Sequence, residues 1–379
     1  MDTTKPLALL GNLSPQVFMK RHWQKKPLLI RQAIPNFSPL LARAELFELA
    51  GQEGVESRLV SQQQGGGWKL KSGPFTRRQL PSLQQPNWTL LVQGVDLHVQ
   101  AMRELMDQFR FVPDARLDDV MISFATEGGG VGPHFDSYDV FLLQAKGTRR
   151  WRISRQKDLS LQPGAPLKIL QNFEPEQTFD LASGDMLYLP PKWAHDGVAL
   201  DECMTYSIGF RAPAKAELAR DLLQRLADDA AEEVGAAMYK DAGQAATDLP
   251  AEIPAGLQAF AQEALREAVR SADSLARALG ESLTEPKSNV WFDAAELVPS
   301  QRGKGRKGGI ALDRRSKMMF DARHIFINGE SFLASGRDAA LMRQLANQRL
   351  LGPELVKTAS PGAKSLLQDW MQAGWLHEL

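Results

Sequence analysis

The stretch GGGVGPHFD at residues 128–136 suggests both the fold and the chemistry of this chain. A His-x-Asp triplet on a β-strand presents its imidazole and its carboxylate on one face, because successive residues of a strand alternate between faces. Both groups can then contact a single ion. The glycines and Pro133 in front of the triplet allow the backbone to bend sharply into that strand. We therefore predict that His134 and Asp136 are metal ligands carried on a strand.

A second segment supplies a third ligand. The run SGDMLYLPP at residues 183–191 has the pattern of a turn, an apolar strand and a proline stop, and Trp193-Ala194-His195 follows it. Such a strand can deliver His195 to the same ion from the opposite side of a barrel. Two histidines and one carboxylate leave about three of six octahedral positions open, as in the facial triad of non-haem Fe(II) oxygenases. The pattern predicts iron with room for a bidentate keto acid and dioxygen.

On both sides of these motifs, short β-prone runs separated by Gly, Pro, Asn and Asp fill residues from about 55 to 212. Many short strands at this spacing favour a sandwich or barrel over a parallel α/β sheet. The expected strands include 88–93, 120–125, 140–144, 149–153 and 186–189. Before them we expect helices at 14–20 and 43–50 around a strand at 27–30. Residues 1–212 are therefore predicted to be the catalytic domain with its N-terminal extension.

The next segment, residues 213–289, has a helical pattern. The stretches 214–234 and 256–280 are rich in Ala, Leu, Glu and Arg, and their apolar residues lie three and four apart. This spacing is typical of amphipathic helices, which have an apolar stripe to bury. The stripe could pack on the barrel or on a second copy of the chain. A homodimer interface is the favoured prediction, and a groove for another partner is the alternative.

The remaining segment, residues 290–379, predicts helices and a β-hairpin that together resemble a winged-helix domain. Strands are expected at 317–320 and 324–327, followed by the strong hairpin turn signal Asn328-Gly329. Helices are expected at 337–348 and 363–373. A glycine-rich basic loop occupies 301–309, but the segment has no basic recognition stripe, so nucleic-acid binding is not predicted.

Composition argues against several classes of function, although local charged patches remain possible. The 45 basic and 45 acidic residues balance, so nothing global indicates a nucleic-acid or acidic-membrane partner. Cys203 is the single cysteine, which rules out a disulfide framework within the chain and suits a reducing cytoplasm. We see no signal peptide and no apolar run of about 18 residues. A cytoplasmic protein without membrane attachment is expected.

Two groups of residues resemble the paired motifs of the cupin superfamily: Gly128, His134, Asp136 and Gly147, then Gly184, Asp185, Pro190 and His195. Many cupins place a glutamate four residues after the second ligand, and here that position is Val140, which favours a three-ligand site. The subset it looks like is the JmjC oxygenases. More narrowly, four stretches are similar to the bacterial ribosomal oxygenases, relatives of the human nucleolar protein hydroxylases: FMKRHWQKKPLLI, NWTLLVQGVD, MISFATEGGGVGPHFDSYDVFLLQAKGTRRWRI and YSIGFRAP.

This resemblance implies a double-stranded β-helix fold of the cupin or jelly-roll kind. It also implies an activity, that of a 2-oxoglutarate-dependent dioxygenase using Fe(II), 2-oxoglutarate and O2. The implied reaction is hydroxylation of an arginine β-carbon (C3) in the large-subunit ribosomal protein uL16, with succinate and CO2 as co-products. The implied partner is a ribosomal protein loop that contains the arginine.

The co-substrate needs a cation for its second carboxylate, and a guanidinium pairs bidentately with such a group. Arg149 shares a strand face with Trp151, so we expect it to point inward, and it matches the basic residue that JmjC hydroxylases use. The family comparison suggests that Ser123 bonds the same carboxylate, and Thr205 or Ser207 could line the pocket. If the substrate side chain is cationic, Asp119 is a candidate partner for it.

Two other classes of function remain open on the sequence. One is a metal-dependent cupin of small-molecule metabolism, with zinc or manganese as possible metals, and coupled succinate release distinguishes it. The other is a non-catalytic ribosome-binding module, which would bind its partner without iron. The intact triad together with Arg149 argues against the binding module.

Overall fold

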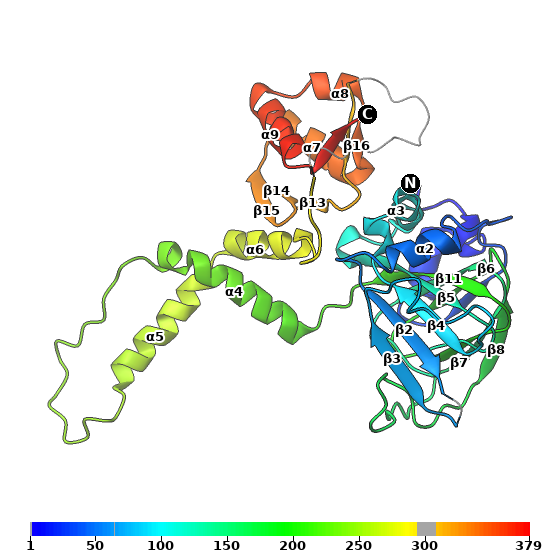
Figure 1. The fold of residues 1–379 in the computed structure, drawn as a ribbon. Helices are drawn as coiled ribbons and strands as arrows, with labels where there is room; N and C mark the ends of the chain where they lie inside the picture. The colour runs from blue at the N-terminus through cyan, green and yellow to red at the C-terminus, as the bar shows by residue number, and fades with distance from the viewer. Residues whose placement is uncertain (1, 64, 294–307) are drawn as a thin grey trace. The chain divides into compact units, whose positions relative to one another are not determined.

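The structure is a computed structural model that describes residues 2–63, 65–293 and 308–379. It divides into two compact units, residues 1–212 and 213–379 (Figure 1). The finer division into 1–212, 213–289 and 290–379 stays a prediction.

The first unit is built on an eight-stranded antiparallel sheet with the strand order β1-β9-β6-β11-β5-β4-β2-β3. Its strands are β1 (Leu28–Ile30), β2 (Ser57–Gln62), β3 (Trp68–Ser72), β4 (Trp88–Val92), β5 (Leu117–Ala125), β6 (Val140–Lys146), β9 (Met186–Leu189) and β11 (Cys203–Phe210). Each of the five strand runs expected from the sequence corresponds to a strand of the structure, four of them in this sheet.

A smaller antiparallel sheet, β10-β7-β8, faces the large one. Its strands are β7 (Arg149–Ser154), β8 (Gln177–Leu181) and β10 (Ala194–Ala199). One apolar cluster joins the two layers, because Leu142 and Leu187 of the large sheet pack with Trp151 and Leu181 of the small one. The predicted jelly-roll fold is confirmed.

The other face of the large sheet is covered by the N-terminal extension and short helices. These are η1 (Ala8–Leu10), α1 (Pro15–Arg21), α2 (Arg43–Leu49), η2 (Val95–Leu97), α3 (Gln100–Asp107) and η3 (Asp114–Arg116). Strand alternation divides β6 between the two cores: Phe141 and Leu143 join the larger cluster under the helices, whereas Val140 and Leu142 face the barrel interior. Polar residues on that interior face are therefore available to a site.

The second unit begins with the helices α4 (Lys215–Val234), α5 (Ala255–Ala268) and α6 (Ala272–Thr284). The stretch 256–280, read from the sequence as one helix, is two. Ser271 is the reason, because its side chain accepts a hydrogen bond from Ser274 N and caps the start of α6.

The rest of the second unit combines two small sheets with three helices. Its strands are β12 (Ile310–Leu312), β13 (Met318–Phe320), β14 (His324–Ile327), β15 (Glu330–Leu333), β16 (Leu350–Leu351) and β17 (Leu376–Glu378), in the orders β16-β12-β17 and β13-β14-β15. Its helices are α7 (Gly336–Gln348), α8 (Pro353–Lys357) and α9 (Pro361–Gln372). The expected hairpin turn is present, with positive φ at Asn328 and Gly329. Helix α6 packs against this part, because Gly280 lies against the ring of Phe326. The predicted basic loop 301–309 lies almost wholly outside the described residues.

No helix in the described part of the chain has both the length and the apolar character needed to cross a membrane.

Candidate metal centre

The three predicted ligands come together in the first unit. His195 lies on β10, and a single antiparallel bridge joins it to His134: His134 N donates to His195 O at 2.9 Å and His195 N donates to His134 O at 2.7 Å. The prediction that His134 and Asp136 lie on a strand is wrong in detail. After that one bridge, the segment forms its next backbone hydrogen bond with the connection between β9 and β10, where Lys192 N donates to Asp136 O. Residues 134–136 therefore form no strand ladder with β10.

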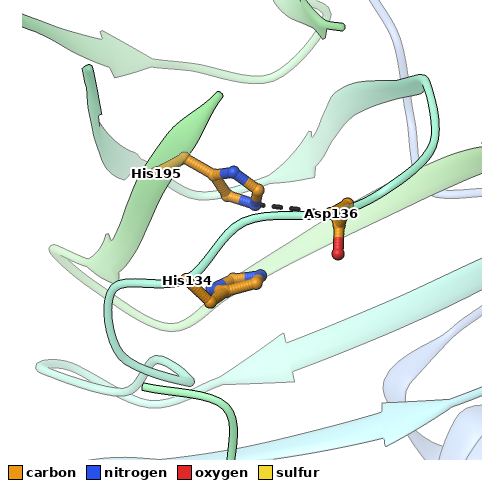
Figure 2. A group of neighbouring side chains, drawn as sticks. All are labelled: His134, Asp136 and His195. Carbon is orange, nitrogen blue, oxygen red and sulfur yellow. Dashed lines mark ion pairs between the residues drawn. The ribbon is translucent and has the colours of Figure 1, made fainter. Parts of the chain in front are cut away.

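The ligand atoms of His134, Asp136 and His195 all lie within 4.8 Å of one another (Figure 2). His195 Nε2 is 3.7 Å from Asp136 Oδ2, and the two imidazole ring centroids are 4.2 Å apart. Within the described residues this is the one cluster of at least three His, Cys, Asp or Glu side chains close enough to hold an ion. The distances allow all three side chains to contact a common metal.

Both imidazoles are oriented by backbone carbonyls. His134 Nδ1 lies 2.8 Å from Gly132 O, and His195 Nδ1 lies 2.9 Å from Trp193 O. We assign the proton to Nδ1 in each ring, because a carbonyl can only accept. The Nε2 lone pair of each ring is then directed at the cluster, which is the arrangement that metal-ligating histidines use.

The charge state of His195 also suits a ligand. Its side chain is buried, and this burial, together with the nearby His134, lowers the pKa of His195 to about 4 although Asp136 opposes the shift. The imidazole is therefore neutral at pH 7, and a neutral imidazole is the form that binds metals.

The donor set distinguishes between metals. Val140, the position where many cupins carry a fourth ligand, is a buried apolar residue at the start of β6. Two histidines and one carboxylate fit a six-coordinate ferrous ion with open positions, whereas a structural zinc site takes four protein ligands. The residues present therefore fit iron.

The second half of the site is a buried guanidinium. Arg149 on β7 is only 4% exposed, and its Nη1 donates to Ser123 Oγ on β5 at 3.1 Å. Its Nε and Nη2 have no hydrogen-bond partner among the described residues. A buried charge with two unsatisfied donors is costly unless an anion completes it. A carboxylate is the group that fits a guanidinium edge.

The neighbouring arginines of β7 point the other way, as strand alternation requires. Arg150 pairs with Asp180 at 2.7 Å and Arg152 pairs with Asp196. Of the two hydroxyls expected to line the pocket, Thr205 is buried and donates to Gln144 Oε1 at 2.9 Å, so its proton is already engaged.

Two polar residues near the site were not predicted. Gln144 follows Val140 and Leu142 on the inward face of β6. A polar residue at an apolar position of a strand could have identified it from the sequence. Tyr138 follows the metal segment and is 40% exposed. Burial of part of the ring raises the pKa of Tyr138, and the carboxylates of Asp136 and Asp119 raise it further. Acidic groups therefore gather at this side of the cluster.

Known families match both parts of the chain. A model described as the JmjC domain matches residues 104–218, and one described as the ROXA-like winged helix matches residues 264–377. The Escherichia coli ribosomal protein uL16 3-hydroxylase is 41% identical over 237 residues, which cover 62% of this chain and 62% of that protein. A probable ribosomal oxygenase of Haemophilus influenzae is 36% identical over 206 residues, covering 53% of this chain and 50% of the relative. These alignments thus span between half and two thirds of the curated relatives.

Solved structures match over more of the chain. A crystal structure of E. coli YcfD has a TM-score of 0.80 and 30% sequence identity, and the match covers 97% of this chain and 98% of that one. A structure of the E. coli ribosomal oxygenase YcfD in complex with cobalt and 2-oxoglutarate matches with a TM-score of 0.76 and 30% identity over the same shares. This chain therefore belongs to the bacterial ribosomal oxygenases, a family of JmjC proteins that carry a ROXA-like winged helix.

Proposed function

We propose that this protein is an Fe(II)- and 2-oxoglutarate-dependent protein hydroxylase that adds a hydroxyl group to the β-carbon of an arginine in ribosomal protein uL16. The observation that carries the proposal is the cluster of His134, Asp136 and His195 in the same barrel as the unsatisfied guanidinium of Arg149. The choice of uL16 as the substrate is supported by the E. coli relative, a ribosomal protein uL16 3-hydroxylase. Succinate and CO2 are the expected co-products.

In this proposal His134, Asp136 and His195 hold Fe(II), while Arg149 and Ser123 hold the far carboxylate of 2-oxoglutarate. When bound, iron and 2-oxoglutarate supply the power to activate O2 and place one of its atoms on an unactivated carbon. The chain itself contributes binding and orientation. The carbonyls of Gly132 and Trp193 fix the two imidazoles.

The barrel also excludes water from the reaction. Leu142, Trp151 and Leu187 belong to the buried apolar cluster that joins the two sheets. An apolar interior strengthens the pairing between Arg149 and a bound carboxylate, because it weakens competition from solvent. The co-substrate is therefore held by charge in a dry environment.

The arginine of the substrate needs an anionic partner, and we propose Asp119 on β5. Its side chain is buried, and Oδ2 accepts hydrogen bonds from Gln93 Nε2 at 2.7 Å and from Gly94 N at 3.2 Å. These two donors hold the carboxylate in a fixed orientation. Asp119 shares a face of β5 with Ser123, because every second residue of a strand points to the same side.

Substitution of this carboxylate tests the assignment. Asp119→Asn is expected to raise the KM for a uL16 peptide containing the target arginine by about tenfold, since the guanidinium loses a charged acceptor worth roughly 1.4 kcal/mol. Affinities for metal and 2-oxoglutarate should not change. The matched control is Asp118→Asn, because Asp118 is a partly exposed neighbour on β5 that pairs with Arg211 at 3.5 Å. Equal effects of both substitutions on KM would remove Asp119 from the substrate site.

We also propose that the chain forms a homodimer through α4 and α5. Several apolar side chains of these helices are exposed, including Leu223 at 56% and Leu265 at 69%, and α5 has no buried residue. Helices with an apolar stripe are stable when a partner covers it. Leu265→Asp should convert a dimer into a monomer in light scattering, whereas the exposed polar control Glu263→Gln should not. A wild-type monomer would contradict the proposal.

The activity is tested with the purified protein, Fe(II), 2-oxoglutarate and a uL16 peptide in air. The expected result is a mass gain of one oxygen in the peptide with an equal amount of succinate. Peptide oxidation without 2-oxoglutarate turnover would favour another kind of metal-dependent cupin, and tight peptide binding without oxidation would favour a binding module. Because its proposed substrate is a ribosomal protein, we propose a cytoplasmic location. In cells, uL16 should carry the modification in the parent strain and lack it when the gene is deleted. That result supports both the proposed activity and the proposed location.

A further inference from the structure

Trp151 is a buried barrel residue whose indole N–H has no role in the reaction proposed above. It lies on β7, two residues after Arg149, and is 5% exposed. Its indole Nε1 has no hydrogen-bond partner in the described part of the chain. Buried donors without partners are rare in native proteins, because leaving one unsatisfied costs about 1–3 kcal/mol. A ligand that accepts this hydrogen bond would remove the cost.

The orientation of the indole is fixed by a glycine on the neighbouring strand. Gly197 of β10 is the register partner of Trp151. A Cβ atom at Gly197 would lie 2.6 Å from Cζ3 and 2.7 Å from Cη2 of the indole. The face of the six-membered ring therefore packs directly on Gly197, which leaves no room for a larger residue at that position.

The indole lies close to both halves of the proposed site. Its ring centroid is 5.9 Å from that of His195, and Cζ of Arg149 is 5.8 Å from its ring. Three buried donor atoms without partners thus occur in one region: Nε and Nη2 of Arg149 and Nε1 of Trp151. Such a region, rich in donors and carrying a positive charge, is suited to an anion with several acceptor oxygens.

We propose that the Trp151 indole N–H donates a hydrogen bond to a carboxylate oxygen of bound 2-oxoglutarate, beside Arg149 and Ser123. Trp151 is then a positioning residue for the co-substrate as well as a part of the apolar wall. This inference rests on the proposed function, because it assumes that the ligand is this dicarboxylate.

Trp151→Phe removes the N–H and keeps an aromatic ring against Gly197. With zinc in place of iron, so that no turnover occurs, the Kd for 2-oxoglutarate is expected to rise about tenfold in calorimetry, as for loss of a hydrogen bond to a charged acceptor. The Kd for zinc should stay unchanged. Trp88→Phe is the matched control, since Trp88 is fully buried in the other core and its Nε1 already donates to Ser82 O at 3.1 Å.

A second measurement reads the hydrogen bond itself. The indole N–H resonance that disappears in Trp151→Phe should move downfield when 2-oxoglutarate is added to the zinc-loaded wild-type protein. If the variant does not fold, the indole signals nearest the site can be identified by their broadening when Mn(II) replaces zinc. An unchanged Kd for 2-oxoglutarate in the variant, or no shift in these resonances, overturns the role of Trp151. If the wild-type protein binds no 2-oxoglutarate at all, it is the proposed function that fails.

Discussion

Replacing His134 by alanine is expected to abolish both Fe(II) binding and turnover. The cluster offers three ligand atoms within 4.8 Å, and the substitution leaves one imidazole and one carboxylate. Loss of an outer-shell partner alone costs about 10–100-fold in metal affinity, so loss of a direct ligand should cost more than about 100-fold. Metal content after dialysis and succinate release measure the two effects.

The same substitution should remove stabilisation by metal. A ligand that binds only the folded chain raises its stability by mass action, so wild-type protein should melt at a higher temperature when Fe(II) or an inert divalent substitute is added without oxygen. His134→Ala should show no such rise. His98→Ala is a suitable control, because His98 ends η2 and lies outside the cluster. Retained activity or a retained rise in melting temperature in His134→Ala would refute the ligand assignment.

The sequence predicted that the three side chains of the cluster lie together, but it did not predict the local backbone that brings them together. The spacing of His134 and Asp136 suggested a strand, but what brings the two side chains together is one bridge to His195 and a bond to the turn before β10. Those contacts join residues about sixty positions apart, and local strand periodicity contains no information about them. The error in the backbone does not affect the predicted cluster, because the ligand atoms of all three side chains still lie within 4.8 Å of one another.

Other features depended on single capping or packing contacts. Ser271 ends one helix and begins the next inside a stretch whose apolar spacing is continuous, so periodicity alone predicted one helix. Arg149, in contrast, was predicted to point inward because it shares a strand face with Trp151, and the structure buries it. The hydrogen-bond partner of Arg149 Nη1 could not be predicted from the strand pattern. It is Ser123 Oγ, which lies on the opposite sheet of the barrel.

Arg149→Ala is expected to raise the KM for 2-oxoglutarate by at least about 100-fold while leaving metal affinity intact. A buried carboxylate that loses its guanidinium partner costs roughly 3 kcal/mol or more, which corresponds to that factor. The KM of Arg149→Lys for 2-oxoglutarate should lie between those of the wild type and Arg149→Ala. An ammonium keeps the charge but cannot offer two parallel donors. The control is Arg150→Ala, whose side chain is 47% exposed and pairs with Asp180. An unchanged co-substrate requirement in Arg149→Ala would remove Arg149 from the pocket.

Arg149→Ala is expected to weaken co-substrate binding without destabilising the fold. Without ligand, the guanidinium is buried, and within the described parts of the chain Ser123 Oγ is the one atom that accepts a hydrogen bond from it, while Nε and Nη2 have no partner. Removing such a charge relieves a desolvation cost, whereas an alanine gives up the packing of a long side chain. We expect the free energy of unfolding of the metal-free protein to change little or to increase, as measured by denaturant titration. A loss of several kcal/mol would mean that Arg149 holds the two sheets together and that its burial is structural rather than a consequence of binding an anion.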